Sequence, residues 1–481
     1  MTGTSRPIGR VLSMCNSTAD WIPKLVVTAK PAPKRSAAQS RRSRGESGSS
    51  RARSCSSSCS PVITNAIAET PSVAISPWFF SPSSNADRPL GLPMVRADQR
   101  SVMETDAVVI VGGGFGGLST ALALSQHQPR PPIVLIEPND RFLFLPLLYE
   151  LLSDELRPWE VAPSYDTLLR RRGIAWIQSR ANRIDTSSRT VQTSHGDCLN
   201  YGQLVLASGS EPDDFGIPGV ADHALRFHTL QDVTLLRERI QALNRQQHRN
   251  VAIVGAGAAG VELACKLADL LRGSATVHLI ERGEEILPNA KAFNREQASR
   301  ALQKRGVELH LRRSVRSVDA SVVHLDQGSL GHDGLIWTAG TRARLPSLTP
   351  SLPCRQGRLL VNDVLCSVAS PSLLAIGDVA VRQTVEAAAD TWPHTAQAAL
   401  QQGQAAARTV MALRAGSEPM PFQFKDLGEM LSLGVGEATI TGMGLTLAGP
   451  LAFQLRRLIY LARLPDLSLG LRSAGAWALG G

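Results

Sequence analysis

The chain has 481 residues and a formal charge of +10, with 51 Lys and Arg against 41 Asp and Glu. The excess lies at the start: residues 1–100 hold 14 basic and 5 acidic side chains, whereas residues 101–481 hold 37 and 36. A near-neutral globular part has no electrostatic footprint for nucleic acid, so we expect no nucleic-acid partner. The sequence also lacks an uninterrupted apolar run of 18 residues, which argues against a membrane-spanning helix.

The basic leader has an unusual composition. Residues 31–60 contain 11 serines, a cluster of five arginines between Arg41 and Arg53, and the single acid Glu46. Ser- and Arg-rich, acid-poor sequence is typical of an organellar transit peptide, which we predict over residues 1–100. A disordered basic tail that stays on the protein is the alternative.

The seven cysteines are dispersed. Three lie in the leader, and Cys198, Cys265, Cys354 and Cys366 are far apart in the rest of the chain. This spacing forms no disulfide framework, CxxC pair or iron–sulfur ligand run, so we predict no metal site. Cys198 and Cys354 could still be neighbours, but buried unreactive thiols are the preferred interpretation.

Strand-like and helix-like segments alternate from about Asp106 to Arg414, which predicts a parallel α/β architecture. The first unit is strand 107–111, helix 115–125 and strand 133–136, and the second is strand 251–254, helix 258–271 and strand 275–280. The chain therefore contains two copies of one Rossmann-like unit. Beyond Pro421 the sequence becomes apolar and Gly-punctuated, which we interpret as an appended C-terminal element rather than more sheet.

The first unit carries a GxGxxG motif at Gly112, Gly114 and Gly117, followed 20 residues later by Glu137. The three glycines permit a tight turn, close approach of backbone N–H groups to a pyrophosphate, and close packing of the helix on the sheet. The helix N-terminus favours the phosphate charge, and Glu137 can accept hydrogen bonds from ribose hydroxyls. This pattern predicts a dinucleotide site, although a solvated carboxylate at a strand end is the alternative for Glu137.

The second unit repeats the pattern at Gly255, Gly257 and Gly260, with Glu281 at the end of the next strand. A carboxylate at this position would bind a ribose 2′-hydroxyl and repel a 2′-phosphate, which favours NADH over NADPH. Adjacent Arg282 softens that preference because a guanidinium offsets part of the repulsion. Two dinucleotide folds in succession suggest FAD in the first and NADH or NADPH, as substrate, in the second.

Three further segments resemble the two-dinucleotide-binding flavoprotein family. The runs LVLASG, ending at Gly209, and LIWTAG, ending at Gly340, look like its strand-and-glycine crossings between domains. The run LLAIGD, ending at Asp378, resembles its second flavin motif, in which the aspartate binds the ribityl chain. Taken alone, a Gly-Asp pair after a strand is usually an ordinary turn.

Within that family the chain resembles the type II NAD(P)H:quinone oxidoreductases, in the plastid and cyanobacterial branch that includes demethylphylloquinone reductase. Disulfide reductases of the family carry a cysteine pair soon after the first acidic residue, but no cysteine lies between Glu137 and Arg180. The resemblance covers about residues 106–466. Its segments are 144–150, which would cover the flavin ring, an AQ motif at 395–399, and the branch-specific stretches 422–434 and 449–466.

The resemblance also implies site residues. Gln397, in the AQ motif, lies where quinone would meet the flavin ring and is a catalytic candidate. Glu262, directly after the second glycine motif, matches a position implicated in proton and quinone handling. An ordinary glutamate on a solvent-facing helix turn is the alternative for Glu262.

Residues 450–463 predict a basic amphipathic helix that begins at a proline suited to a first helical turn. On a helical wheel, one face holds Leu451, Leu455, Leu458, Ile459 and Ala462, whereas Arg456 and Arg463 lie opposite and Arg457 to one side. Such a helix is suited to the interface of an anionic membrane. A core-packing helix with a solvated basic edge is the alternative. After Leu467 the chain departs from the family pattern.

We therefore expect an FAD domain of residues 106–226 and 344–415, interrupted by an NAD(P)H domain of 227–343 and followed by a membrane-associated region of 416–481. The expected activity is non-proton-pumping reduction of a membrane quinone, plastoquinone or demethylphylloquinone, in the chloroplast at the thylakoid or plastoglobule. Mitochondrial delivery and a homodimer stay open. The alternatives are a soluble reductase for a small electron-carrier protein such as a ferredoxin, and a flavin-based redox sensor.

Overall fold

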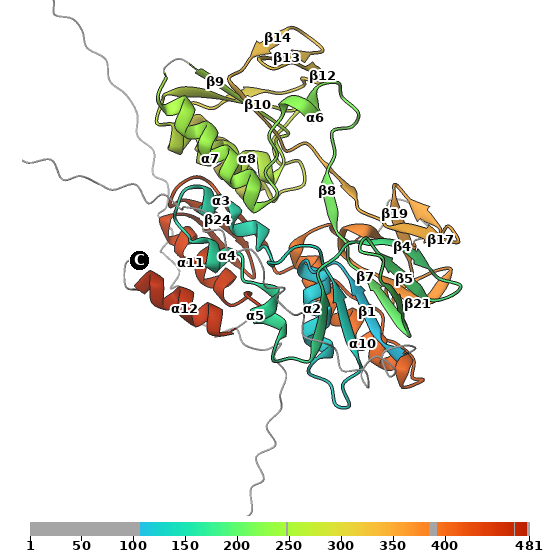
Figure 1. The fold of residues 1–481 in the computed structure, drawn as a ribbon. Coiled ribbons are helices and arrows are strands. Elements are labelled where there is room, and N and C mark those ends of the chain that lie inside the picture. Colours follow the sequence, from blue (N-terminus) through green and yellow to red (C-terminus); the bar gives the residue numbers. More distant parts are fainter. Residues whose placement is uncertain (1–105, 247–248, 384–391, 466, 479–481) are drawn as a thin grey trace, which may run out of the picture. The chain divides into compact units, whose positions relative to one another are not determined.

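The computed structural model describes residues 106–246, 249–383, 392–465 and 467–478. The predicted leader, residues 1–100, lies outside the described residues. The predicted α/β class is confirmed, because parallel sheets flanked by helices make up most of the described chain (Figure 1).

The larger sheet has β1 (Val108–Val111) near its centre, paired in parallel with β2 (Ile133–Ile136) and β7 (Gln203–Leu206). Successive side chains of β1 alternate between two apolar clusters: Val108 and Ile110 belong to one, and Val109 and Val111 belong to the other. This explains why the strand reads as a continuous apolar run. The strand order is β18-β19-β20-β21-β7-β1-β2-β3, with β22 also paired to β19. The other strands are β3 (Ile174–Ile177), β18 (Cys354–Arg355), β19 (Arg358–Val361), β20 (Cys366–Ser367), β21 (Ser370–Ala375) and β22 (Ala380–Arg382).

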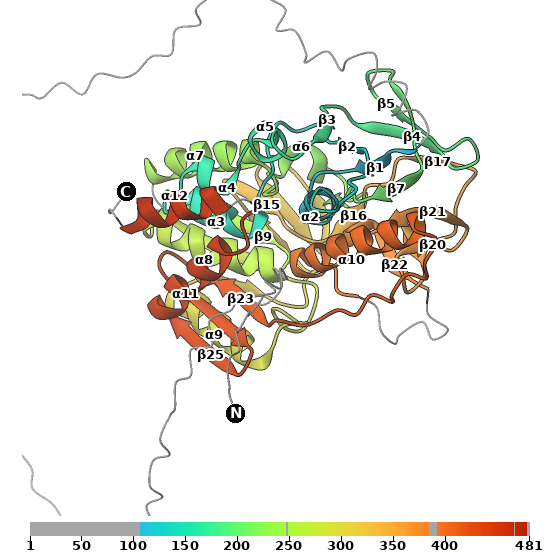
Figure 2. The ribbon, with the colours of Figure 1, turned by 90° about the horizontal axis from the view of Figure 1, so that it is seen from below.

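Two helices that are far apart in the sequence pack together beside this sheet: α2 (Phe115–Leu124) and α10 (Ala396–Arg414) (Figure 2). Their contact depends on small residues, since a Cβ at Gly403 would lie 2.4 Å from the carbonyl oxygen of Gly116. Thr120 Oγ1 donates to the Gly403 carbonyl at 3.2 Å across the same contact. This packing carries the start of α10 to the first glycine motif.

The second sheet has the order β11-β10-β9-β15, all parallel. Its strands are β9 (Arg249–Val254), β10 (Ala275–Ile280), β11 (Glu308–His310) and β15 (Gly334–Trp337). The helices of this region are α7 (Leu230–Asn244), α8 (Ala258–Leu271) and α9 (Ala292–Lys304), of which α7 and α8 lie side by side (Figure 1). On the other face, Ile280 shares an apolar cluster with Val318 and Val323 of an antiparallel meander, β12 (Val315–Val318), β13 (Val322–Leu325) and β14 (Ser329–Gly331).

The chain crosses between the two sheets on β8 (Ser210–Pro212) and β16 (Thr341–Ala343), which pair antiparallel. All strands of the larger sheet lie within residues 106–226 and 344–415, and those of the second within 227–343. The predicted domain boundaries themselves stay a prediction. Smaller elements complete the described part: β4 (Ala181–Asp185), β5 (Thr190–Thr193), β6 (Cys198–Asn200), β17 (Ser347–Thr349), η1 (Leu145–Leu147), α3 (Leu148–Leu152), α4 (Pro158–Val161), α5 (Tyr165–Leu169), α6 (Val220–His223) and η2 (Gly377–Val379).

The C-terminal region differs from the prediction. It contains a three-stranded antiparallel sheet of its own, β23 (Glu429–Ser432), β24 (Ala438–Gly442) and β25 (Leu445–Gly449), so the expectation that it adds no sheet is wrong. Helices α11 (Pro450–Leu461) and α12 (Leu467–Ala478) follow. β23 contacts α8 and α9, which fixes this region to the second sheet's helices (Figure 2). Among the described residues, no helix combines the length and apolarity needed to cross a bilayer.

Candidate functional site

The first glycine turn has the geometry of a dinucleotide cradle. Gly112 has φ +97°, and a Cβ at Gly117 would lie 1.8 Å from the Gly112 carbonyl oxygen, so neither position tolerates a side chain. Gly114 caps α2, and a Cβ there would meet nothing within 4 Å. This open space at a helix N-terminus suits a phosphate approaching the backbone. Glu137 accepts from Gly113 N at 2.7 Å and Asn139 N at 2.9 Å, which fixes its carboxylate beside the turn.

The second turn repeats this geometry closely. Gly255 has φ +103°, a Cβ at Gly260 would lie 1.8 Å from the Gly255 carbonyl oxygen, and Gly257 faces open space. Glu281 accepts from Ala256 N at 2.7 Å and Gly283 N at 2.8 Å. The two copies read from the sequence therefore fold into two equivalent cradles.

A cavity of about 810 Å³ opens at the first turn. Its lining includes the predicted residues Gly112, Gly114, Glu137, Gly209 and Asp378. Residues from the second region also contribute, because the segment 228–231 at the start of α7 lines the same cavity. The size and the two-sided lining suit a dinucleotide cofactor of the size of FAD.

The remaining predicted residues lie around this cavity or at the crossings. Asp378, in η2, accepts from Ser210 Oγ at 2.5 Å. Gln397 is half buried in the first turn of α10 and does not line the cavity, whereas its neighbours Thr395 and Ala396 do. Gly209 and Gly340, with φ +69° and +82°, directly precede β8 and β16.

Glu262 is not on a solvent-facing turn, so that alternative is excluded. Its side chain is buried on α8, where Oε1 accepts from Ser432 N of β23 at 2.7 Å. Tyr149 hydrogen-bonds to the same carboxyl group. Glu150 is fully buried nearby, in the apolar segment that was expected to cover the flavin ring.

Arg456 balances these two acids. The sequence predicted that it lies opposite the leucine face of the C-terminal helix, and the structure buries it completely on that opposite side. Its Nη1 forms an ion pair with Glu150, and its Nη2 lies 3.9 Å from Glu262 Oε1. Burial alone would lower the pKa of Arg456, but Glu150, Tyr460 and Glu262 outweigh it and raise that pKa, so the guanidinium stays charged. We call Tyr149, Glu150, Glu262, Arg456 and Tyr460 the buried charge cluster.

Burial raises the pKa of Glu262 to about 7. Arg456 and the Ser432 N–H oppose this rise, and Glu150 adds to it. Two carboxyl groups and one guanidinium are electrically balanced when one carboxyl group carries a proton. The cluster can therefore hold and release one proton near neutral pH, which is the property of a general acid.

The buried charge cluster adjoins the main cavity. Arg456 Nη2 donates to the carbonyl oxygen of Pro146 at 2.6 Å, and Pro146 lines the cavity. Phe144 packs against Tyr460 and against Phe115, which also lines the cavity, with ring centroids 5.3 and 5.2 Å apart. Glu262 is thus linked to the wall of the dinucleotide cavity through Arg456 and Pro146.

The outer face of α11 carries two exposed leucines with Gln454 between them. Leu451 and Leu458 are 68% and 58% exposed, whereas Phe453, Arg456 and Tyr460 on the opposite face pack into the protein. Of the predicted apolar face, Leu451 and Leu458 point away from the protein, whereas Leu455 and Ile459 are half buried and pack against an apolar cluster with Ile440 of β24.

Sequence reasoning missed the partners of Glu262. Glu150 stands alone among apolar residues in FLPLLYELL, and a charged residue isolated in such a run signals a buried ion that needs a partner. Arg456 gives no such signal, because Arg457 follows it directly. The pairing itself joins residues 306 positions apart, so no local spacing indicates it.

The four cysteines of the described residues differ in exposure. Cys265 and Cys366 are buried, but Cys198 and Cys354 are exposed, so the expectation of buried thiols is wrong for these two. All four are free thiols.

Comparison with known proteins gives consistent results. Residues 106–403 match the family model described as pyridine nucleotide-disulphide oxidoreductase. The chain is 37% identical to demethylphylloquinone reductase of Synechocystis over 78% of this chain and 98% of that one. It is 33% identical to the alternative NAD(P)H-ubiquinone oxidoreductase C1, chloroplastic/mitochondrial, of Arabidopsis thaliana, over 74% and 78%. The solved structure of NDH2 from Plasmodium falciparum with NADH has the same fold, with a TM-score of 0.69 at 17% identity over 76% of this chain and 96% of that one.

Proposed function

Because this chain belongs to the pyridine nucleotide-disulphide oxidoreductase family and, within it, to the type II NAD(P)H:quinone oxidoreductases, we propose that it transfers electrons from NADH or NADPH through FAD to a membrane quinone. FAD binds in the main cavity, with its pyrophosphate at Gly114 and its ribityl chain at Asp378. NADH or NADPH binds at the second glycine turn, with Glu281 at the adenosine ribose.

The residues present fit the flavin. Open space at Gly114, the carboxylate of Glu137 beside it, and a cavity of about 810 Å³ match a long dinucleotide with two phosphates. When bound, FAD supplies the two-electron chemistry that links a hydride donor to a quinone acceptor. The protein's contribution is to bind, orient, exclude water and supply protons.

The proton requirement defines the task of Glu262. Converting a quinone to a quinol takes two electrons and two protons, and a hydride brings two electrons and one proton. The second proton must come from a protein acid or from solvent. A carboxyl group with a pKa of about 7, hydrogen-bonded to Tyr149 and held next to the cavity wall, can donate it near neutral pH.

The observation that carries this proposal is the position of Arg456. One guanidinium contacts the cavity wall at Pro146, pairs with Glu150 and lies near Glu262. It thereby holds the proton-carrying acid next to the flavin cavity. Gln397, one position beyond cavity-lining Ala396, is proposed to contact the quinone at the other side of that cavity.

The quinone and the compartment are proposed from the relatives. The Synechocystis relative is a demethylphylloquinone reductase, and the Arabidopsis relative is chloroplastic/mitochondrial. We propose that demethylphylloquinone or plastoquinone is the acceptor and that the protein acts in the plastid, at the thylakoid or plastoglobule. The name of the Arabidopsis relative also supports delivery to mitochondria as the alternative. The homodimer stays a prediction.

Membrane contact is proposed for the outer face of α11. Exposed Leu451 and Leu458, together with exposed Met443 and Leu445 of the preceding hairpin, would enter the lipid interface. Such contact would place the quinone's source beside the buried charge cluster.

The proposal is tested with the protein lacking residues 1–100, loaded with FAD and added to liposomes. Anaerobic oxidation of NADH and NADPH is followed with a plastoquinone or naphthoquinone analogue, with ferricyanide or with ferredoxin. We expect quinone-dependent turnover that increases in the presence of liposomes. Reduction of the flavin without quinone turnover, or lipid-independent turnover with ferredoxin alone, would contradict the proposal.

A further inference from the structure

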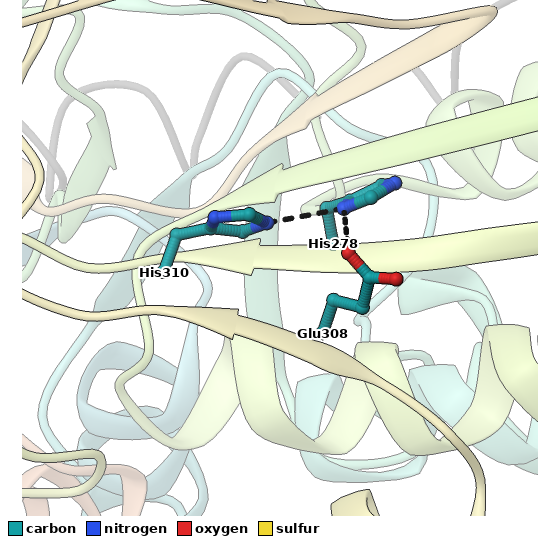
Figure 3. A group of neighbouring side chains, drawn as sticks. All are labelled: His278, Glu308 and His310. Carbon is teal, nitrogen blue, oxygen red and sulfur yellow. Dashed lines mark hydrogen bonds and ion pairs between the residues drawn. The ribbon is translucent and has the colours of Figure 1, made fainter. Parts of the chain in front are cut away.

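Three side chains on neighbouring strands of the second sheet converge on one point (Figure 3). His278 of β10 is buried, His310 of β11 is half buried, and Glu308 of β11 is exposed. His278 Nδ1 lies 3.1 Å from His310 Nε2 and 3.2 Å from Glu308 Oε2. Their strands are paired in parallel, with His278 opposite Glu308 and Ile280 opposite His310. The register of the sheet therefore fixes the group.

The remaining nitrogen of His278 has its own partner. His278 Nε2 lies 3.2 Å from Asn250 Oδ1, and an amide oxygen can only accept a hydrogen bond. His278 is then protonated at Nε2, and its Nδ1 presents a lone pair.

A lone pair on Nδ1 is poorly matched to Glu308. A carboxylate oxygen also accepts only, so the 3.2 Å contact between the two atoms calls for a positive charge between them. A proton moved from Nε2 to Nδ1 is one solution, but it would leave His278 Nε2 and Asn250 Oδ1 in contact as two acceptors. A metal ion satisfies both atoms and His310 at the same time.

The distances agree with that solution. Ligands bound to zinc at about 2.0–2.1 Å in a tetrahedron lie about 3.3 Å from one another. The two shortest separations here are 3.1 and 3.2 Å, and all three ligand atoms lie within 4.8 Å of one another. In the part of the chain that the structure describes, this is the one group of His, Cys, Asp and Glu with such spacing.

We propose that His278, Glu308 and His310 form a zinc site in which Asn250 orients His278 and solvent completes the coordination. Two imidazoles and a carboxylate are a zinc ligand set, and an accepting group on the second nitrogen of a histidine is the usual outer support. The exposed side of Glu308 leaves the fourth position open to water. This proposal is independent of quinone reduction, and it reverses the sequence-based expectation that no metal is bound.

The site borders the nucleotide cradle. Glu281, three residues after His278, donates its backbone N–H to the His310 carbonyl oxygen at 2.9 Å. Zinc would link β10 to the edge strand β11 near Glu281, whose carboxylate is proposed to bind the ribose. Bound metal should therefore stabilise this region and shift the KM for NADH more than kcat.

The test uses the full chain with FAD, stripped of metal by a chelator and titrated with zinc against a chromophoric zinc indicator. We expect one site that is lost in His310→Gln and weakened in Glu308→Gln. Asn250→Ala should weaken binding by about 10- to 100-fold, as outer-sphere partners do. His324→Gln is the matched control, since His324 is a histidine on β13 of the separate antiparallel sheet and pairs with a single carboxylate, Asp319, at 2.7 Å.

Two further measurements guard against misfolding and other ligands. The thermal midpoint should rise with zinc in the parent protein and in His324→Gln, but not in His310→Gln or Glu308→Gln, both of which change side chains that are not fully buried. Cobalt substitution should give a spectrum without thiolate charge transfer, because no cysteine takes part. Unchanged zinc stoichiometry in His310→Gln, or a thiolate band in the cobalt protein, would overturn the proposal.

Discussion

At the scale of single residues, two glycines of the second turn have different roles: Gly257 leaves space for the nucleotide, and Gly260 allows the turn itself to pack. Gly257 has φ −71° and faces open space, whereas a Cβ at Gly260 would overlap the Gly255 carbonyl oxygen. We expect Gly257→Ala to change the free energy of unfolding by less than about 0.5 kcal/mol. It should raise the KM for NADH roughly tenfold, because the added methyl group occupies the space of the pyrophosphate. Gly260→Ala should cost about 1–3 kcal/mol. Thermal midpoints and NADH kinetics measure both, and equal losses of stability would contradict this division.

Glu281 controls which nucleotide is preferred. Its carboxylate is fixed by Ala256 N and Gly283 N, so its charge would lie close to a 2′-phosphate. Removing one like charge at about 4 Å is worth about 1 kcal/mol in water, which corresponds to roughly fivefold. We expect Glu281→Gln to lower the ratio of kcat/KM for NADH over NADPH by about that factor. An unchanged ratio would show that Arg282 or another residue sets the preference.

Glu262 should produce a pH dependence. Its pKa is raised to about 7, so the carboxyl group is protonated below that pH and loses the proton above it. As a proton donor it is active in the protonated form, and kcat with quinone should fall as pH rises through about 7. Glu262→Gln should lose this limb and lower kcat by about 10²- to 10⁴-fold.

Ferricyanide is the control for Glu262, because its reduction takes electrons without protons. Its rate should be nearly the same in the parent protein and in Glu262→Gln. A similar loss with both acceptors would assign Glu262 to flavin or nucleotide binding instead.

At the scale of elements, α11 has two faces with different tasks. Its inner face supplies Arg456 to the buried charge cluster, and its outer face exposes Leu451 and Leu458. We expect the double variant Leu451→Gln/Leu458→Gln to bind anionic liposomes more weakly, by roughly tenfold or more, since burying each leucine is worth about 1.5–3 kcal/mol. Sedimentation with liposomes measures this. Leu235→Gln, an exposed leucine on α7, is the matched control, and equal binding by all three proteins would exclude α11 as the contact.

At the scale of the whole molecule, Arg456 joins three distant regions: the cavity wall at Pro146, Glu262 of α8 and its own C-terminal helix. We expect Arg456→Met to destabilise the protein by about 3–5 kcal/mol, because Glu150 is left buried without its cation. Since Arg456 lowers the pKa of Glu262, its loss should also move the alkaline limb of quinone reduction to higher pH.

Adding Glu150→Gln to Arg456→Met tests the same idea. The double variant removes both charges of the pair and should recover part of the lost stability in chemical denaturation. Strictly additive losses would mean that Arg456 supports the fold through packing alone.

The two nucleotide-binding units can be predicted from the sequence, because each depends on local geometry. A glycine turn, a helix start and a strand-end acid lie within about 25 residues, so Gly112 to Glu137 and Gly255 to Glu281 were readable without a fold. The AQ segment and Asp378 were found by resemblance to a family, and the structure brings Asp378 to the main cavity.

The pairing of the buried charges depends on the tertiary fold. Glu150 and Arg456 are 306 positions apart, and a helical wheel put Arg456 opposite the leucines without showing its partner, because a wheel cannot represent a residue of another element. The exposure of Cys198 and Cys354 and the convergence of His278, Glu308 and His310 likewise depend on strand pairing. The local sequence pattern predicts backbone turns and apolar faces. Whether a charged side chain is buried depends instead on which distant residue the fold places beside it as a partner.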